Sequence, residues 1–366
     1  MRLIIKSILC IFAIVMMVRC KKEEPNTRII FNDINFLNVL LEAGVDKDGD
    51  YRISSTEARA VRTLVINNRD ISDLTGIEAF ITLDSLFCSG NQLSIIDVSR
   101  NTHLEYLKVS NNNLVSLNVS NNPALVELDC SGNKLTTLDV SNNTVLLELR
   151  CDFNELTSLD VSGNKALKLL FCQENQLTAL DVSYNSDLTG LRCSNNRITT
   201  LDVSKNKSLF SLICNDNKLT NLDISNNNVL NTLSCNNNML TNLIIPDNGA
   251  PYYLHCSNNL LSSLNISRNT VLKDINCNDN QLTSLNVSNK LDLQRLSCGG
   301  NQLSTLDISN NSRLQGTEYG KYCMLDITNM PNLQKVCVWT LPFPPVGFRL
   351  CSTGSPNVYF TTDCSK

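Results

Sequence analysis

The chain has little of the chemistry that catalysis and nucleic-acid binding use. Its 366 residues include only two histidines, His103 and His255, so neither a Ser/His/Asp triad nor a histidine-based metal site is expected. Glycine is scarce, at 14 residues, and no glycine-rich phosphate loop occurs. The net charge is −4, without a long run of Lys or Arg, which excludes the basic surface that DNA or RNA requires. The sequence therefore predicts no enzyme and no nucleic-acid partner.

Aromatic residues are also few, at 5% of the chain, whereas 42% of the residues are hydrophobic. The core must therefore be filled by Leu, Val, Ile and Cys. One pattern returns every 21 residues, and a fixed period of this length predicts a repeat solenoid, in which turns must stack to bury their apolar faces. The period is marked by Leu83, Leu104, Leu125, Leu146, Leu167, Leu188, Leu209, Leu230, Pro251, Leu272, Leu293 and Leu314.

Each turn reads L-x-x-L-x-C-x-x-N-x-L-x-x-L-x-V-x-x-N. Residues 127–131 alternate between polar and apolar positions, which predicts a strand with Leu128 and Cys130 facing the core. Each turn therefore adds one strand to a parallel sheet. The second half of each turn has Val or Ile at its inward position, which favours short strands on the convex side over helices.

An asparagine occupies one position of every turn, where the strand must bend. Buried backbone groups that neighbouring strands leave unpaired cost about 1–3 kcal/mol each, and an Asn amide can both donate and accept there. The row is predicted to be a structural ladder. It consists of Asn91, Asn112, Asn133, Asn154, Asn175, Asn196, Asn217, Asn238, Asn259, Asn280 and Asn301.

Cysteine recurs at one inward position, and Val109 and Tyr319 stand where this row lapses. Disulfides are the first interpretation for an exported chain. However, Val109 shows that the position requires a small buried hydrophobe, and neighbouring side chains in a parallel sheet suit the disulfide dihedral poorly. The sequence predicts reduced, packed thiols at Cys88, Cys130, Cys151, Cys172, Cys193, Cys214, Cys235, Cys256, Cys277 and Cys298.

This combination of repeat length, asparagine ladder and cysteine ladder resembles bacterial leucine-rich repeat proteins of the internalin class, in their 21-residue, cysteine-ladder variety. It is also similar to leucine-rich repeat lipoproteins of Bacteroidetes. The resemblance covers residues 61–331, most of the chain. It implies a right-handed leucine-rich repeat solenoid or horseshoe with a parallel concave sheet. For function it implies surface attachment or recognition.

The first 20 residues are interpreted as a lipoprotein-type signal, followed by a tether at 21–29. Arg2 and Lys6 precede an apolar run from Ile8 to Val18 that is too short to span a membrane comfortably. The run ends at Cys20, which the resemblance to bacterial lipoproteins makes the lipidated residue, although Arg19 replaces the usual small residue. An ordinary cleaved signal or an uncleaved anchor is the alternative. Each predicts an exported chain, and lipidation predicts a surface-exposed outer-membrane lipoprotein.

Residues 30–60 are expected to cap the first turn. Apolar residues at helical spacing predict a helix from Ile30 to Ala43, with Ile30, Ile34, Leu37, Leu40 and Leu41 on its covering face. The next segment resembles an EF-hand calcium loop with Tyr51 where glycine is usual. Either a structural Ca²⁺ or a metal-free cap is consistent with it. The ligand positions fall on Asp46, Asp48, Asp50, the Arg52 carbonyl, Ser54 and Glu57.

Residues 332–366 are expected to form a second cap. The segment that begins at Leu325 is interpreted as the repeat of the convex segment that begins at Leu306. Leu333, Val336 and Val338 are interpreted as a last strand. Prolines and Trp339 then prevent a regular repeat, so the tail is predicted to fold over the open end. Four cysteines lie off the ladder and can form one or two disulfides whose pairing is left open. They are Cys323, Cys337, Cys351 and Cys364.

The outward strand positions are the candidate binding surface, because the repeat fixes every inward one. Aromatic and arginine side chains on a rigid sheet are typical of interface hot spots. The leading interpretation is a monomeric surface recognition or adhesion protein that binds a protein or glycan through the concave face. The alternative is a structural or spacer component of the envelope. The candidate residues are Phe87, Tyr106, Arg150, Leu169, Phe171, Arg192, Ile213, Tyr253 and His255.

Overall fold

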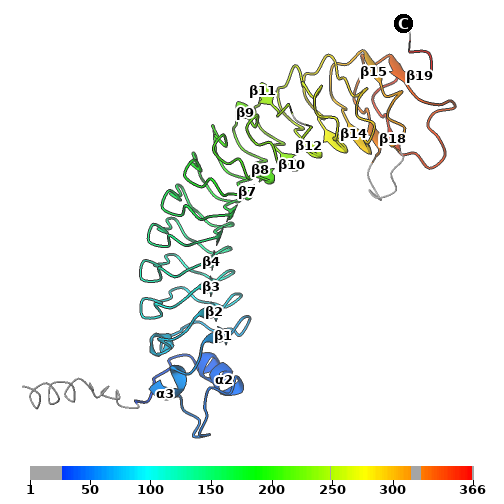
Figure 1. The fold of residues 1–366 in the computed structure, drawn as a ribbon. Coiled ribbons are helices and arrows are strands. Elements are labelled where there is room, and N and C mark those ends of the chain that lie inside the picture. Colours follow the sequence, from blue (N-terminus) through cyan, green and yellow to red (C-terminus); the bar gives the residue numbers. More distant parts are fainter. Residues whose placement is uncertain (1–26, 248, 315–322, 365–366) are drawn as a thin grey trace, which may run out of the picture.

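The protein is an arched solenoid whose inner side is a long parallel sheet (Figure 1). The computed structural model describes residues 27–247, 249–314 and 323–364. The predicted signal, Cys20 and most of the tether therefore lie outside the described residues, as does Tyr319. No helix in the described ranges is long and apolar enough to cross a membrane.

The inner, concave sheet has fourteen strands that pair in sequence order. Equivalent residues of neighbouring turns face each other in register, as Leu107 faces Leu128 and Leu128 faces Leu149. The strands are β1 Thr63–Val65, β2 Ser85–Phe87, β3 Tyr106–Lys108, β4 Glu127–Asp129, β5 Glu148–Arg150, β6 Leu169–Phe171, β7 Gly190–Arg192, β8 Ser211–Ile213, β10 Thr232–Ser234, β12 Tyr253–His255, β13 Asp274–Asn276, β14 Arg295–Ser297, β16 Leu325–Asp326 and β18 Leu350–Cys351.

Strands on the convex side are fewer than the sequence predicts. They form two small parallel sheets, one of β9 Asn221–Asp223 and β11 Asn242–Ile244, the other of β15 Thr305–Asp307, β17 Lys335–Cys337 and β19 Tyr359–Thr361. In the other described turns this side is extended chain without a named strand, apart from a bridge between Asn118 and Asp139. The expected absence of convex helices holds from residue 81 to residue 314 of the described chain, and η1 Ile77–Ala79 is a single 3-10 turn before it.

The asparagine ladder performs the predicted hydrogen bonding. The Asn175 side-chain oxygen accepts a hydrogen bond from the Leu156 backbone N–H at 2.9 Å. Its amide nitrogen donates to the carbonyls of Cys151 (3.0 Å), Cys172 (3.2 Å) and Gln173 (3.2 Å). One side chain thus bonds to four backbone groups from two turns, and asparagine occupies this position in every turn from Asn91 to Asn301.

A second asparagine row lies at the convex bend, and its members have almost no exposed surface. Asn143 donates from its amide nitrogen to the carbonyls of Val119 (3.1 Å) and Asn122 (2.8 Å). Lys290 replaces asparagine in this row and has no exposed surface either. Its ammonium group donates to the Asn289 side chain, and burial lowers the pKa of the lysine. The ladder bonds of this turn are therefore replaced by a buried amine.

The ten ladder cysteines are free thiols with no exposed surface, as predicted. Several of them donate weakly to the next strand, as Cys130 Sγ does to the Arg150 carbonyl at 3.4 Å. Burial raises the pKa of Cys88, Cys193, Cys256 and Cys298 to about 12. Because a thiol reacts as its thiolate, these cysteines are unreactive while the solenoid is folded.

The N-terminal cap is built on α2 Ile34–Glu42 and α3 Ser55–Ala58. The predicted start at Ile30 is wrong, because the Asp33 carboxylate accepts from the amides of Asn35 and Phe36 and so caps the helix there. The predicted covering face is also wrong at its first two positions, since Ile30 is 74% and Ile34 is 64% exposed. Leu40 is buried as predicted and Leu37 and Leu41 pack partly buried against the core, while Phe36 and Val39 supply the rest of the buried face.

At the C-terminal end the strand register differs from the prediction. Leu325 pairs with Leu296 in the concave sheet, and Val336 is the residue that pairs with Leu306 on the convex side. The predicted match of Leu325 to Leu306 is therefore wrong, since both segments share a Leu-Asp-Ile-Ser/Thr motif and only the pairing distinguishes them. Val336 is not in the last strand either, because β18 and β19 follow it. Aromatic rings of the tail pack together beside this turn, with Phe343 5.5 Å from Trp339 and 4.8 Å from Phe360 between ring centroids.

Candidate functional site

The concave strands present two outward columns of side chains, one on each side of the buried leucine. Tyr106, Leu169 and Tyr253 stand in the first column, where they pair in register with the same position of the next turn. The second column carries the six other candidates: Phe87, Arg150, Phe171, Arg192, Ile213 and His255. Arg150 and Arg192 are exposed, and the other seven candidates are half-buried. All nine residues thus share one surface.

Phe171 on β6 lies between two arginines of the neighbouring strands. The Arg150 guanidinium carbon is 4.7 Å from the centroid of the Phe171 ring, and that of Arg192 is 5.3 Å from it. Each contact is a cation–π interaction, which stabilises both the ring and the cations by about 0.5–1 kcal/mol at an exposed site. Arg150 is held further by Glu148, whose carboxylate lies 2.5 Å from Nε. The aromatic ring is therefore oriented before any ligand arrives.

Carboxylates lie beside this sandwich. Asp152, in the next outward position after Arg150, has a raised pKa because it is partly buried and lies near Asp129, although Arg150 and Arg192 oppose the shift. Lys108 forms an ion pair with Glu127 at 2.8 Å and lies 5.6 Å from the Phe87 ring centroid. The surface is thus mixed in charge, which is typical of protein interfaces and unlike a phosphate or nucleic-acid site.

Sequence reasoning missed Asp274 on β13. Its side chain is only 4% exposed and lies 3.4 Å from His255 Nε2 and 3.6 Å from an Arg295 guanidinium nitrogen. The repeat could have indicated Asp274, because it stands at an outward strand position in register with Tyr253 of the preceding turn and Arg295 of the next. The burial of its carboxylate could not be predicted from the repeat. Asp274 therefore places a buried carboxylate beside the histidine and the arginine at the far end of the concave face.

The calcium-type loop brings three of its six predicted ligands together. Carboxylate oxygens of Asp46, Asp48 and Glu57 lie within 4.8 Å of one another, whereas Asp50 is not part of this group. The Asp50 amide N–H lowers the pKa of Asp48, but desolvation and the charges of Asp50, Glu57 and Asp46 outweigh it and raise that pKa. Carboxylate oxygens of this kind are the hard ligands that Ca²⁺ prefers.

The backbone of the loop also fits this geometry. Tyr51 has φ of +61°, the left-handed conformation expected of the position where glycine is usual. The Asp46 carboxylate accepts the amides of Gly49 and Tyr51, which curls the chain around it. Ser54 and Glu57 form a capping box on α3 through their side chains and backbone amides.

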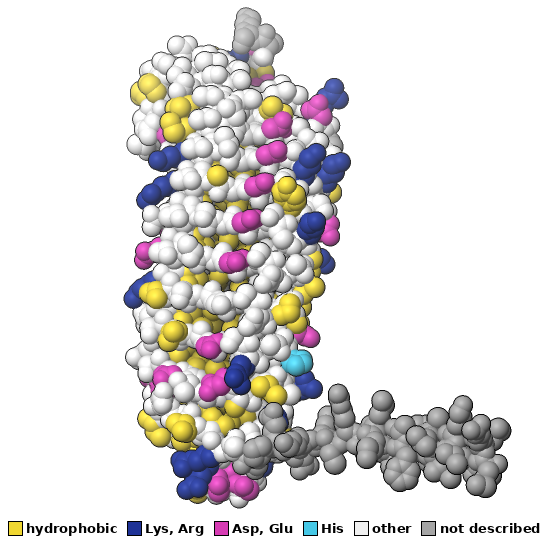
Figure 2. All heavy atoms as spheres, turned by 90° about the vertical axis from the view of Figure 1, so that its left-hand side faces the viewer, with side chains coloured by type: hydrophobic (Ala, Val, Ile, Leu, Met, Phe, Trp, Pro, Cys, Tyr) yellow, Lys and Arg dark blue, Asp and Glu magenta, His cyan; other side chains and the backbone are white. Residues whose placement is uncertain are grey.

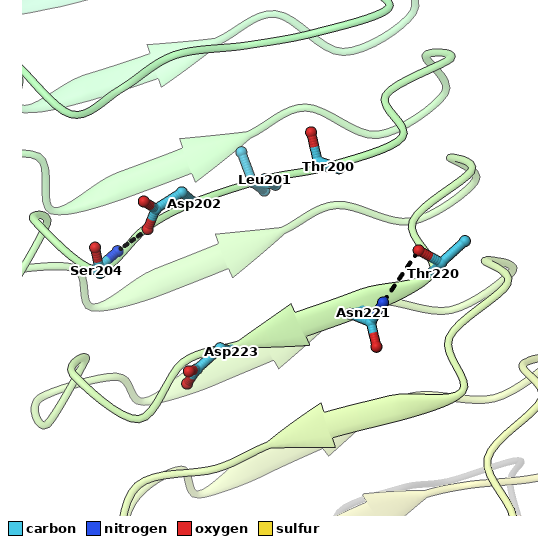
Figure 3. Close-up of a pocket in the computed structure, with 7 residues that line it drawn as sticks. All are labelled: Thr200, Leu201, Asp202, Ser204, Thr220, Asn221 and Asp223. Atoms are coloured by element: carbon cyan, nitrogen blue, oxygen red, sulfur yellow. Dashed lines mark hydrogen bonds between the residues drawn. The ribbon is translucent and has the colours of Figure 1, made fainter.

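The convex face offers a different candidate, a row of aspartates seen on the outer side of the arch in Figure 2. Each aspartate accepts the amide of the serine two residues later, as Asp202 does from Ser204 at 2.8 Å. A shallow depression of about 320 Å³ lies between Asp202 and Asp223, lined also by Thr200 and Thr220 (Figure 3). Because the same parts recur at turn after turn, this surface is a product of the repeat and singles out no site.

Comparison with known proteins supports the fold and its subclass. The family model of the leucine-rich repeat domain of endo-β-N-acetylglucosaminidase EndoS matches residues 52–164. A search of curated protein sequences finds no match. The functional domain of InlJ from Listeria monocytogenes, which includes a cysteine ladder, is 32% identical, with a TM-score of 0.72 over 84% of this chain and 74% of that one.

Two further solved structures share the fold. Internalin InlF from Listeria monocytogenes is 20% identical, with a TM-score of 0.67 over 92% of this chain and 97% of that one. A leucine-rich repeat protein of Leptospira interrogans is 22% identical, with a TM-score of 0.66 over 84% of this chain and 87% of that one. With the repeat, the cysteine ladder and the InlJ match agreeing over most of its length, the chain belongs to the internalin-type leucine-rich repeat proteins.

Proposed function

We propose that this chain is a recognition protein that binds a protein ligand through the concave face, with Phe171 at the centre of the contact. The observation that carries the proposal is the Arg150–Phe171–Arg192 sandwich. The repeat requires only the inward residues, so nothing in the fold calls for an aromatic ring between two arginines. Large aromatic and arginine side chains contribute most of the binding energy in protein interfaces. A glycan bound by the same residues is the second ligand class that this surface would suit.

The test compares two aromatic-to-alanine variants on opposite faces. Phe171→Ala should weaken binding to a ligand found on a protein and glycan array at least about tenfold, which corresponds to about 1.4 kcal/mol. Tyr184→Ala is the matched control, because Tyr184 is 55% exposed in a convex loop. The measurement is the dissociation constant by surface plasmon resonance with the whole exported chain.

Equal affinities of Phe171→Ala and the parent protein for every array ligand would contradict the concave contact. A chain that binds no array ligand at all would favour the alternative, a spacer in the cell envelope. Catalysis forms no part of the proposal, since His103 Nδ1 lies 3.1 Å from the Ile81 carbonyl oxygen and His255 lies on β12 beside Asp274, so the two histidines stand in separate turns.

We further propose that the chain is exported and anchored as a monomer through lipidated Cys20 on the surface of the outer membrane. The support is sequence-based: the apolar run before Cys20 and the polar tether after it. Mass spectrometry of the membrane-extracted protein should find a diacylglyceryl group on Cys20 as the first residue. A soluble, unmodified N-terminus would reject the anchor without affecting the proposed contact at Phe171.

We also propose a structural Ca²⁺ in the loop of residues 46–57, held by Asp46, Asp48 and Glu57, whose carboxylate oxygens already lie together. Asp50, the Arg52 carbonyl and Ser54 are the remaining ligands of the proposal. When bound, the ion would neutralise the carboxylates and stiffen the cap on the first turn. Addition of Ca²⁺ at one hundred times its dissociation constant should raise the free energy of unfolding by about 2.7 kcal/mol. Isothermal calorimetry of the whole chain measures the dissociation constant of Ca²⁺, and thermal unfolding measures the gain in stability.

Asp48→Asn is the informative variant, because the Asp48 side chain accepts only the Asp50 amide and does not cap a helix. It should abolish the calcium heat while the protein stays folded. Asp187→Asn, at an exposed convex position, is the control and should leave that heat unchanged. Absence of both heat and thermal shift in the parent protein at millimolar Ca²⁺ would leave the metal-free cap as the correct interpretation.

A further inference from the structure

Two thiols and a carboxylate meet on the outer surface of the last turns. Cys337 ends β17, where it pairs with Asp307 on one side and with Thr361 on the other. The inward residue of this strand is Val336, so Cys337 points to the convex side, yet it is only 5% exposed. Cys364 lies three residues beyond β19, and its sulfur, that of Cys337 and an Asp307 oxygen are within 4.8 Å of one another.

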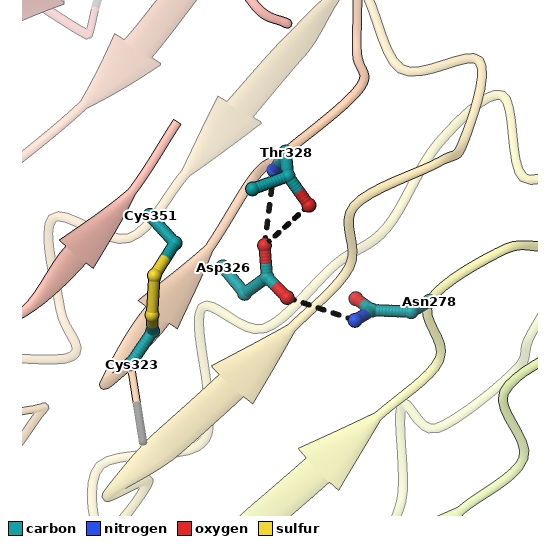
Figure 4. The surroundings of a disulfide bond; sticks show 5 residues. All are labelled: Asn278, Cys323, Asp326, Thr328 and Cys351. Atoms are coloured by element: carbon teal, nitrogen blue, oxygen red, sulfur yellow. Dashed lines mark hydrogen bonds between the residues drawn. A yellow bond between two sulfur atoms is a disulfide. The ribbon is translucent and has the colours of Figure 1, made fainter. Parts of the chain in front are cut away.

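A disulfide already joins the same two turns through the concave sheet. Cys323 precedes β16 and Cys351 ends β18, and the bond between them connects Cα atoms 5.9 Å apart (Figure 4). These strands are neighbours in the concave sheet, just as β17 and β19 are neighbours in the convex one. Cys323 and Cys351 are 28 residues apart, and Cys337 and Cys364 are separated by almost the same length of chain.

We propose that Cys337 and Cys364 form a second disulfide, so that the final turn is fastened to the preceding one once through each sheet. The inference rests on the contact of the two sulfurs, on the equivalent bridge in the other sheet and on the edge position of β18 and β19. Edge strands expose unpaired backbone groups and fray or pair with other chains, and a solenoid needs its last turn held in place. It does not depend on the proposed ligand.

The chemistry is an exchange with a disulfide-bearing oxidant of the compartment to which the chain is exported. The thiolate of exposed Cys364 attacks one sulfur of the oxidant, forming a mixed disulfide and releasing one thiolate. Cys337 then loses its proton and attacks the Cys364 sulfur, which forms the new S–S bond and expels the second thiolate. Two protein thiols are oxidised, one external disulfide is reduced to two thiols, and two protons leave the protein.

The order of attack follows from the surroundings of each group. Burial, together with the neighbouring Cys364 and Asp307, raises the pKa of Cys337 to about 11. Cys337 is therefore the slower nucleophile and the resolving thiol. The ladder thiols take no part because they have no exposed surface and face the core. Oxidation is thus confined to the end of the solenoid.

The test is a peptide map of the whole protein made in an oxidising compartment, alkylated in denaturant and digested without reductant. Trypsin cuts after Lys335 and Arg349, which separates 322–335, 336–349 and 350–366, the last with both Cys351 and Cys364. Two bridges predict one species of three linked peptides. Further cleavage with chymotrypsin after Tyr359 or Phe360 separates Cys351 from Cys364. The same enzyme cuts after Trp339, so the Cys337 fragment 336–339 should remain attached only to the Cys364 fragment.

An alkylated, unlinked 336–349 peptide would overturn the proposal, and so would one equivalent of zinc bound to two free thiols beside Asp307. The variants give a second readout that does not depend on the map. Cys364→Ser should speed amide exchange in β19 at least tenfold, whereas Cys323→Ser should affect β18 first. Cys256→Val in the ladder is the control for loss of a thiol elsewhere, because Val109 already occupies an equivalent position. Equal exchange in β19 of Cys364→Ser and the parent protein would also contradict a bridge there.

Discussion

Raising the pH above about 9 should unfold this protein far more steeply than its content of surface charges predicts. The ordinary pKa of a cysteine is 9.0, and burial raises it to about 12 in four ladder thiols and raises it in the six others. A folded-state pKa above the unfolded value gives stability that is complete below pH 9. That stability is lost as the pH rises toward 12, because only the unfolded chain can release these protons.

The size of the effect comes from the number of identical groups. Each thiol contributes about 1.4 kcal/mol per pH unit once it is ionised in the unfolded chain, so ten contribute about 14 kcal/mol per unit. This exceeds the whole stability of an ordinary domain, which is about 5–15 kcal/mol. Urea unfolding followed by circular dichroism from pH 8 to pH 11 measures the loss, and thiolate absorbance should appear only with unfolding.

Valine substitution supplies the control, because Val109 already occupies a ladder position without exposed surface. Replacing Cys172, Cys193 and Cys214 by Val should remove about 4 kcal/mol per pH unit from the slope and shift the alkaline limit upward. A slope that is unchanged in this triple variant would show that other groups govern the alkaline transition.

Replacing one ladder asparagine should destabilise the protein by about 3–5 kcal/mol. In Asn175→Ala the Leu156 N–H loses its acceptor, and the carbonyls of Cys151, Cys172 and Gln173 each lose a donor. All of these groups are shielded by the neighbouring turns, so water cannot replace the amide without opening the solenoid. The measurement is the free energy of unfolding by urea, with Asn142→Ala as control because Asn142 is exposed.

The reverse change tests the same argument in the second ladder. Lys290→Asn should stabilise the protein, since an asparagine there can donate to the carbonyls of Ile266 and Asn269 as Asn311 does to those of Val287 and Lys290. It also removes a buried amine. If Asn175→Ala proved neutral, or if Lys290→Asn destabilised the chain, the ladders would not be the source of stability that the hydrogen bonds indicate.

The loop of residues 46–57 illustrates a carboxylate cluster whose members the sequence could only partly indicate. The spacing of its oxygen ligands and the unusual Tyr51 could be recognised in the sequence, and the left-handed φ of Tyr51 fits the expected geometry. Which carboxylates meet depends on the fold of the loop, which brings Asp46, Asp48 and Glu57 together and leaves Asp50 outside that group. Spacing along the chain defines the possible ligands, whereas side-chain direction selects among them.

The repeating part of the molecule was determined by the sequence alone. A 21-residue period makes each turn's neighbour a copy of itself, so the inward leucines, the cysteine ladder and the asparagine ladder must each stack in register, as Leu128 does on Leu149. The same logic made the outward columns predictable, and with them the shared surface of Phe171, Arg150 and Arg192.

Only the tertiary structure decided what happens where the period ends. Leu306 and Leu325 begin nearly identical segments, and strand pairing alone assigns one to the convex side and the other to the concave sheet. The Cys323–Cys351 pairing, the start of α2 after its cap Asp33 and the burial of Asp274 were settled in the same way. The physical reason is that a repeat carries its own register in every turn, whereas its ends and its side-chain contacts depend on residues distant in sequence.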